Sequence, residues 1–301
     1  MLDGIDIVDP HFHLIDFHNN PYPWLAVDAT RPNIFGGRDS ELRHVFLEPD
    51  YRRAAGNLTI KKAVHIQANW DPSDPVGETK WLAERIARNG FPTAAVAFAN
   101  LASPHVGDIL AAHAAHGFVR GIRHIVNWDD EPTLRFSDRP DYLTNEDWLS
   151  GFALLECFGL SFDAQLYHHQ MDQLMAVAAK YPSVQIIINH TGMPIHRDPQ
   201  AIIAWSSSLA RIAEAPNVAI KISGLGLANP DWSADSIRPL VLTAIEHFGI
   251  DRAMFASNFP VEGLFTTFGQ LYAAFDAITK DFIHEERVKL FQTNAERLYC
   301  I

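Results

Sequence analysis

The residues best suited to chemistry in this sequence are histidines that follow short apolar runs. The stretch "VDPHFHL" places His11 and His13 two residues apart. Because side chains alternate between the two faces of a strand, both imidazoles should project from the same face. Such a pair could hold a metal ion or move a proton near neutral pH. With 15 histidines in the chain, the pair could also arise by chance and serve only as hydrogen-bonding polar groups.

Two further polar residues occupy equivalent places after other apolar runs. "IIINHTGMP" supplies His190 and "FASNFP" supplies Asn258. In a parallel barrel the ends of all strands form one rim, so these two side chains would join His11 and His13 there. Three neutral imidazoles could bind Zn²⁺ and leave a position for water. This convergence depends on the fold.

Alternating strand and helix patterns predict that fold. Eight short runs rich in Val, Ile and Phe are each followed by a longer, mostly amphipathic stretch, which is typical of βα units around a parallel sheet. The predicted strands are "GIDIVD", "KKAVHIQ", "TAAVAFA", "VRGIRHI", "LSFDAQL", "SVQIIIN", "NVAIKIS" and "RAMFAS". We therefore expect an α/β protein, a single (β/α)8 TIM barrel domain over residues 1–301.

Helices are predicted from amphipathic segments between these strands. They are "ETKWLAERIARNG", "VGDILAAHAAHG", "NEDWLSGFALLECFG", "QMDQLMAVAAKYP", "PQAIIAWSSSLARIAEAP", "ADSIRPLVLTAIEHFG" and "HEERVKLFQTNAERLY", with "PDYRRAAG" the weakest pattern. Long irregular stretches follow strands one and four, at residues 14–50 and 126–145. In a barrel both would overhang the C-terminal face, where active sites lie. Trp24 in the first stretch could cover a substrate pocket or simply pack its own loop.

Composition narrows the classes of function. Hydrophobic residues make up 48% of the chain, enough for a large core, while the net charge of −12 and the lack of a basic run argue against nucleic acid. Cys157 and Cys300 form no metal or disulfide pattern, and no stretch approaches the length that spans a membrane. We expect a cytoplasmic protein, monomeric or homodimeric, whose partner is a small molecule.

Motifs along almost the entire chain, in order, resemble one enzyme family. They are "DPHFHL", "YPWL", "IQANWDPSDPVGETKWL", "GIRHIV", "FDAQLY", "INHTGMP", "IKISGLG" and "SNFPV". The series resembles the amidohydrolase superfamily, in the amidohydrolase-related branch of TIM barrels that includes sugar-acid lactonases and 2-pyrone-4,6-dicarboxylate lactonase. The series is specific to this branch and much less specific to a substrate.

The resemblance implies roles for the four rim residues. In the family, two histidines after strand one, one after strand six and an aspartate after strand eight face the reacting carbonyl. His11, His13 and His190 match the histidines, and they would be the ligands if a metal is bound. Asn258 departs from the aspartate. Some members of the branch work without a tightly held metal, so the resemblance leaves zinc open and implies no organic cofactor.

A second departure concerns strand five, where the family's usual histidine ligand is not evident. "FDAQLYHH" places Gln165 or Tyr167 near the rim, and it places His168 and His169 in the following loop.

Asn258 changes the expected chemistry because an amide oxygen is essentially non-basic. It can orient water by hydrogen bonds, but the proton must pass to His190, to His11 or His13, or to a metal-bound hydroxide. The metal-free histidine route is slightly favoured. Asn258 could also be a plain strand-end residue, a loss of activity or a deliberate inactivating change. Phe259, which replaces the usual Trp of "SDWP", argues for a natural variant group.

Substrate recognition is expected from side chains at other strand ends. Arg123 suits a carboxylate on the substrate, because a guanidinium binds carboxylates bidentately, or it could pair with Asp129 or Glu262. Gln67 and Tyr167 could donate to ring hydroxyls or the lactone oxygen, or bond within the structure. Lys221 is expected to be buried or paired, with Schiff-base chemistry a minor alternative.

These observations favour a hydrolase that opens a small sugar-acid or carboxylated lactone by attack of water at the carbonyl. Two alternatives stay open. One is a metal-dependent decarboxylase of an unsaturated or aromatic acid, which the resemblance also suggests. The other is a ligand-binding barrel without turnover, because Asn258 stands in place of the usual Asp.

Overall fold

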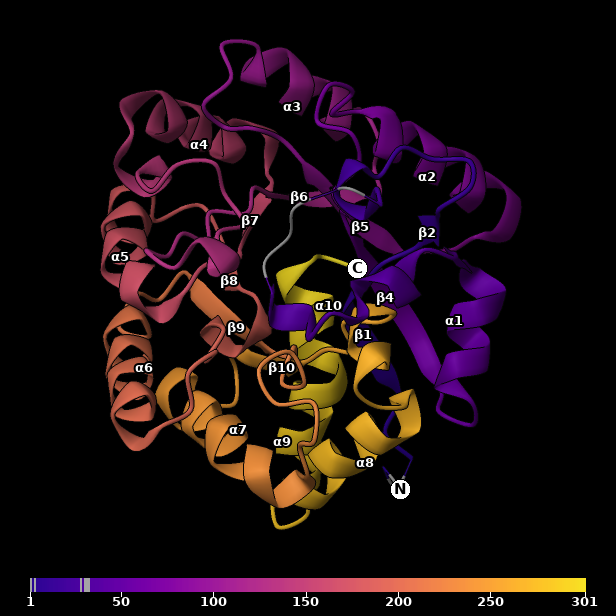
Figure 1. The fold of residues 1–301 in the computed structure, drawn as a ribbon, viewed down its shortest axis with the longest axis vertical. Helices are drawn as coiled ribbons and strands as arrows, with labels where there is room; N and C mark the ends of the chain where they lie inside the picture. The colour runs from indigo at the N-terminus through magenta and orange to yellow at the C-terminus, as the bar shows by residue number, and fades with distance from the viewer. Residues whose placement is uncertain (1, 3, 28, 30–32) are drawn as a thin grey trace.

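Eight parallel strands form a barrel surrounded by helices (Figure 1). The computed structural model describes residues 2, 4–27, 29 and 33–301. The barrel strands follow one another in chain order: β1 (Ile7–Phe12), β4 (Ile60–Ile66), β5 (Ala94–Phe98), β6 (Val119–Arg123), β7 (Ser161–Ala164), β8 (Ile186–Ile188), β9 (Val218–Ile222) and β10 (Ala253–Phe255). Each lies within or overlaps one of the eight predicted runs. The predicted (β/α)8 barrel is confirmed.

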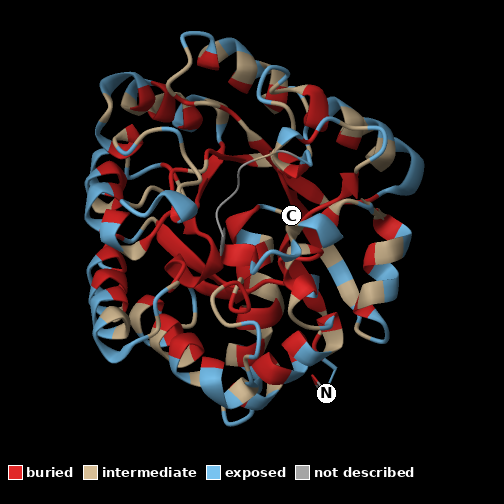
Figure 2. Ribbon diagram, viewed as in Figure 1, coloured by how far each residue is buried: buried red, intermediate tan, exposed pale blue. Residues whose placement is uncertain are grey.

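One helix follows each barrel strand and packs outside it. These helices are α1 (Glu48–Ala55), α2 (Gly77–Asn89), α3 (Val106–Ala114), α4 (Glu146–Phe158), α5 (Met171–Lys180), α6 (Pro199–Ile212), α7 (Ala234–Phe248) and α8 (Phe268–Ile278). The strands are buried, and the helices expose only their outer faces (Figure 2). Strands covered on both sides explain why many of the predicted runs are apolar on both faces. The weak "PDYRRAAG" pattern does form α1, whereas α8 was not predicted.

The C-terminal segment closes the end of the barrel at which the strands begin. It comprises α9 (His284–Val288), a π-helical turn (Lys289–Thr293) and α10 (Asn294–Leu298), and Figure 1 shows α10 over the centre of the strand ring. Asn294 Nδ2 donates to the carbonyl oxygens of Ile250 and Ala253, where β10 begins. Tyr299 packs with the barrel interior. The opposite end of the barrel is therefore the one left open to a ligand.

The two long loops lie at that open end, as predicted. The first contains the short antiparallel pair β2 (Ile15–Asp16) and β3 (Val45–Phe46) with 3₁₀ turns at Pro23–Leu25, Asn33–Phe35 and Arg38–Leu42. The second, after β6, contains 3₁₀ turns at Pro132–Leu134 and Tyr142–Thr144. Among the described residues no helix has both the length and the apolar character needed to cross a membrane.

Candidate active site

A cavity of about 480 Å³ opens at the C-terminal ends of the strands. Its floor includes His13, His190 and Asn258, and its walls come partly from the two long loops. Aromatic and aliphatic side chains supply most of those walls, among them Trp24, Ile34, Phe35, Trp70, Phe136 and Leu227. A concave, largely apolar space with a few convergent polar groups is the usual form of a small-molecule site.

The three predicted histidines are brought together at the base of this cavity. The ring centroid of His11 lies 5.1 Å from that of His13 and 4.6 Å from that of His190. His13 and His190 line the cavity, while the fully buried His11 is not among its lining residues and lies beside them. The predicted convergence of residues about 180 positions apart in sequence therefore occurs.

Asp9 fixes the strand tip that carries His11. Its carboxylate accepts from the Tyr51 hydroxyl at 2.7 Å, the Ser257 backbone N–H at 2.9 Å and the Ser257 hydroxyl at 2.5 Å. Burial raises the pKa of Asp9, although these donors oppose the shift. The contacts tie the tip of β1 to the end of β10, and so hold His11 next to Asn258.

The backbone conformations at His190 and Asn258 aim their side chains. Both residues lie in the left-handed region, with φ of 53° and 57°. Asn and His enter this region more readily than most residues, but any non-glycine residue there is uncommon and is held by surrounding contacts. One such contact is the close approach of Gly224, where a Cβ atom would lie 2.8 Å from the His190 Cβ. Only glycine leaves room for His190 at this point.

Burial keeps the imidazoles neutral. It lowers the pKa of His11, His13 and His190 well below the ordinary value of 6.5. The positive charge of Arg123 lowers the pKa of all three further, and that of Lys221 lowers the pKa of His11 and His190. His13 Nδ1 lies 2.7 Å from the carbonyl oxygen of Ile66. Because a carbonyl only accepts, Nδ1 carries the proton and Nε2 keeps its lone pair. His13 is thus a neutral base at the cavity surface.

Arg123 is a buried cation without a carboxylate partner in the described part of the chain. Its Nη1 donates to Gln165 Oε1 at 3.0 Å and its Nη2 to the carbonyl oxygen of Gln67 at 2.5 Å. Its Nε has no partner, and burial lowers its pKa to about 10. The alternative pairing with Asp129 or Glu262 does not occur. Arg123 lines the cavity and can bind an anionic oxygen there.

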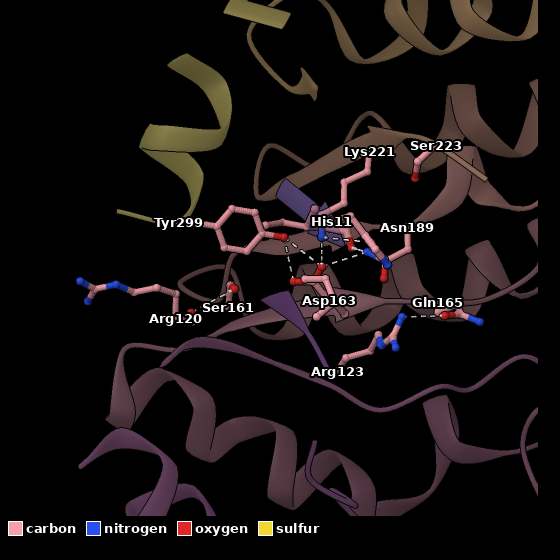
Figure 3. Close-up of polar contacts among 12 residues, drawn as sticks. His11, Arg120, Arg123, Ser161, Asp163, Gln165, Asn189, Lys221, Ser223 and Tyr299 are labelled. Carbon is pink, nitrogen blue, oxygen red and sulfur yellow. Dashed lines mark hydrogen bonds and ion pairs between the residues drawn. The ribbon is translucent and has the colours of Figure 1, made fainter. Parts of the chain in front are cut away.

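Beneath the histidines, a buried network is centred on Asp163 of β7 (Figure 3). Lys221 Nζ lies 2.5 Å from Asp163 Oδ1 and 3.5 Å from His11 Nδ1. Tyr299 donates its hydroxyl to the same carboxylate, and Asn189 Nδ2 donates to it at 2.9 Å. Lys221 is thus buried and paired, as predicted. Burial lowers its pKa to about 8 even though Asp163 opposes the shift.

A second buried carboxylate, Glu262, lies behind Asn258. Glu262 is fully buried, its Oε1 accepts from the Gly226 backbone N–H at 2.7 Å, and its backbone N–H donates to the Asn258 carbonyl at 2.9 Å. Burial raises the pKa of Glu262 to about 7, although the Asn258 side chain and Gly226 lower it. Asn258 Nδ2 and Glu262 Oε2 have no well-aligned partner in the described structure. The amide and the carboxylate are therefore neighbours, and Glu262 faces Asn258 rather than Arg123.

The remaining predicted residues differ in their placement. Gln67 lines the cavity, but its side chain is engaged with Asn69, accepting from the backbone N–H at 2.6 Å. Trp24 both lines the cavity and packs its loop, with Nε1 donating to the Ala68 carbonyl at 2.8 Å. Tyr167 is buried, donates to the Leu134 carbonyl at 2.8 Å and is not among the cavity-lining residues. Gln165 takes its place at the cavity wall.

The arrangement of the three histidines does not fit a divalent cation as it stands. Among the described residues no group of three His, Cys, Asp or Glu side chains is arranged to hold a metal ion. The cations Lys221 and Arg123 act on His11 and His190 and would repel a metal ion, and Asn258 supplies no negative charge. His11 Nε2 is buried and has no hydrogen-bond partner among the described residues, so this one ring nitrogen is free to act as a metal ligand. Zinc binding by His11, His13 and His190 stays a sequence-based hypothesis.

Comparison with known proteins identifies the family to which the chain belongs. The family model described as amidohydrolase matches residues 8–301, so the chain belongs to the amidohydrolase family. A Sinorhizobium fredii protein described as uncharacterized is 42% identical over 300 residues, covering 100% of both chains. An L-fucono-1,5-lactonase of Burkholderia ambifaria is 27% identical, covering 97% of this chain and 93% of its own.

Solved structures share the fold. An amidohydrolase from Burkholderia multivorans with bound zinc superposes with a TM-score of 0.82 at 21% identity, covering 98% of this chain and 99% of its own. A putative 2-pyrone-4,6-dicarboxylic acid hydrolase from Pseudomonas putida gives 0.71 at 19% identity, covering 98% of each chain. At these identities the likeness shows the barrel architecture alone.

Proposed function

We propose that the protein hydrolyses a small lactone by adding water to the ester carbonyl of the ring. The proposal rests on one observation: at the base of one cavity, neutral His13 lies near Arg123, whose guanidinium has no carboxylate partner among the described residues. Lactonases among the relatives at 24% and 27% identity support the same reaction class.

Arg123 supplies the positive charge that the reaction needs. Attack at a carbonyl converts its oxygen into an oxyanion, and a fixed donor aimed at that oxygen stabilises the transition state more than the ground state. The guanidinium is held by Gln165 and Gln67 and is not neutralised by a carboxylate among the described residues. It can therefore bind the developing oxyanion or a carboxylate on the substrate.

His13 is the group best placed to take the proton from water. Its Nε2 lone pair is fixed by the bond from Nδ1 to Ile66, and its lowered pKa keeps it unprotonated at neutral pH. Asn258 lines the same cavity and orients the water, since its amide cannot accept the proton as a base. The proton on His13 can then pass to the leaving ring oxygen, which becomes the hydroxyl of the product acid.

A product-resolved assay tests the proposal. Lactones of five- and six-membered rings, with and without carboxyl and hydroxyl groups, are incubated with the protein, and acid release is followed above the spontaneous rate. Arg123→Met should lower kcat/KM by about 100-fold or more, because an oxyanion loses its donor. Exposed Arg88→Met is the control. Release of CO₂ from an unsaturated acid would select a decarboxylase instead, and tight binding without turnover would select a binding barrel.

A further inference from the structure

One side of the cavity carries three polar side chains that the proposed reaction does not use. Asn100 follows β5, His124 follows β6, and Asp138 lies in the long loop after β6; all three line the cavity. Tyr142 joins two of them, because its ring packs against His124 in a tilted contact with centroids 4.5 Å apart and its hydroxyl donates to Asp138 Oδ1 at 2.7 Å.

His124 offers the cavity a donor. Its Nδ1 lies 3.1 Å from the Trp148 Nε1–H and 3.4 Å from the Leu101 backbone N–H. Both neighbours can only donate, so Nδ1 accepts and the proton of the neutral ring is on Nε2. Burial lowers the pKa of His124 to about 4, which keeps the ring neutral. Within the described residues Nε2 makes no hydrogen bond, so its N–H is available to a bound molecule.

Asn100 adds a second donor and Asp138 adds an acceptor. Asn100 Oδ1 accepts from the Ala102 backbone N–H at 3.0 Å, and this fixes the amide so that Nδ2 is the group left to donate. Asp138 Oδ1 is occupied by Tyr142, which leaves Oδ2 to accept. The three residues therefore present two donors and one negatively charged acceptor to the same cavity.

This set matches hydroxyl groups and opposes a carboxylate. A hydroxyl both donates and accepts, so neighbouring hydroxyls can donate to Asp138 while accepting from His124 and Asn100. A second carboxylate on the ligand can only accept and would meet the charge of Asp138. An unsubstituted ring would leave the polar groups unsatisfied on desolvation.

We propose that Asn100, His124 and Asp138 form a hydroxyl-binding subsite, which selects a polyhydroxylated, sugar-derived lactone over a dicarboxylated or unsubstituted one. The inference rests on the proposed lactone hydrolysis for its consequence in catalysis. The subsite itself rests only on the hydrogen-bond geometry around these side chains.

The test compares two lactones with the same six-membered ring, glucono-1,5-lactone and δ-valerolactone. The wild type should prefer the hydroxylated ring. Asp138→Asn should lower the ratio of the two kcat/KM values about 10-fold, because the charged acceptor is lost. Asn100→Asp, which keeps the acceptor for Ala102 but replaces the donor, should lower the ratio similarly. The matched control is Asp130→Asn, an exposed acid of the same loop outside this cavity, which should keep the wild-type ratio.

A binding measurement separates failure of the subsite from failure of the proposed function. Calorimetry with gluconate, the opened product, should show about 10-fold weaker binding to Asp138→Asn than to the wild type and Asp130→Asn. If no lactone is opened but this difference appears, the proposed reaction fails and the subsite stands. Equal gluconate affinity, or an unchanged ratio for both cavity variants, overturns the subsite.

Discussion

The backbone N–H of Asn258 lies 2.7 Å from the carbonyl oxygen of His11, and this hydrogen bond joins the end of the last strand to the tip of the first. The bond places the Asn258 side chain over the histidines through the backbone alone. A change of the side chain at this position should therefore alter the chemistry and electrostatics of the site without moving it.

Asn258→Asp tests the electrostatics directly. The new carboxylate would lie beside buried Glu262, and two adjacent carboxylates oppose each other's ionisation. We expect the variant to lose about 1–3 kcal/mol of unfolding free energy at pH 8, measured by urea denaturation. In a Glu262→Gln background the same change should cost at least about 1 kcal/mol less. Additive effects of the two substitutions would show that the side chains do not interact.

Lys221→Met should be strongly destabilising, because it leaves the Asp163 carboxylate buried without its ion-pair partner. We expect the free energy of unfolding, measured by chemical denaturation, to fall by about 3–5 kcal/mol. Lys289→Met is the control, since Lys289 and Asp251 form an exposed pair at 2.7 Å, and its loss should be about 1 kcal/mol or less. Similar losses for the two variants would contradict the buried network.

The neutral histidines predict how stability changes in acid. Their folded pKa values lie below 6.5, whereas the unfolded chain binds protons at about 6.5. Below that pH the unfolded state binds more protons than the folded state, so the unfolding free energy falls as pH falls. His190→Asn should make this dependence less steep between about pH 6.5 and pH 5. An equally steep profile would mean that His190 titrates normally when folded.

Glu262 should give the opposite dependence of stability on pH. Its folded pKa of about 7 exceeds the ordinary 4.5, so its contribution to stability is present at acid pH and is lost as pH rises through 7. The difference in unfolding free energy between Glu262→Gln and the wild type should shift in favour of the variant by at most about 3 kcal/mol on going from pH 4.5 to pH 8. Glu285→Gln, at an exposed position, is the control. No difference between the two variants would place Glu262 in contact with water.

Much of the fold could be predicted because βα units carry strong local patterns. All eight strands were predicted from apolar runs, and Asn145 and Gly90 mark helix ends as their residue types suggest. Helix α8 was missed although its amphipathic pattern is no weaker than those of α3 and α4, which were predicted. Its Thr267–Gln270 capping box was the available signal.

The site was predicted less completely, because tertiary contacts decide which polar residues face the cavity. The histidines followed from their places at strand ends. Tyr167, in contrast, turns to the Leu134 carbonyl, which no local pattern shows. The Asp163–Lys221 pair had a usable signal, since two opposite charges lie inside apolar strands and buried charges need partners. Glu262 lies in a short 3₁₀ turn (Val261–Leu264) after β10, where sequence alone does not indicate burial.

The most direct test of lactone hydrolysis is kcat/KM for the best lactone, measured on metal-depleted protein for the wild type, His13→Gln and exposed His105→Gln. The account predicts ring opening well above the spontaneous rate by the wild type and the His105 variant, and a loss of about 100-fold or more for His13→Gln. A wild type no faster than buffer, or a His13→Gln variant as active as the wild type, would contradict it.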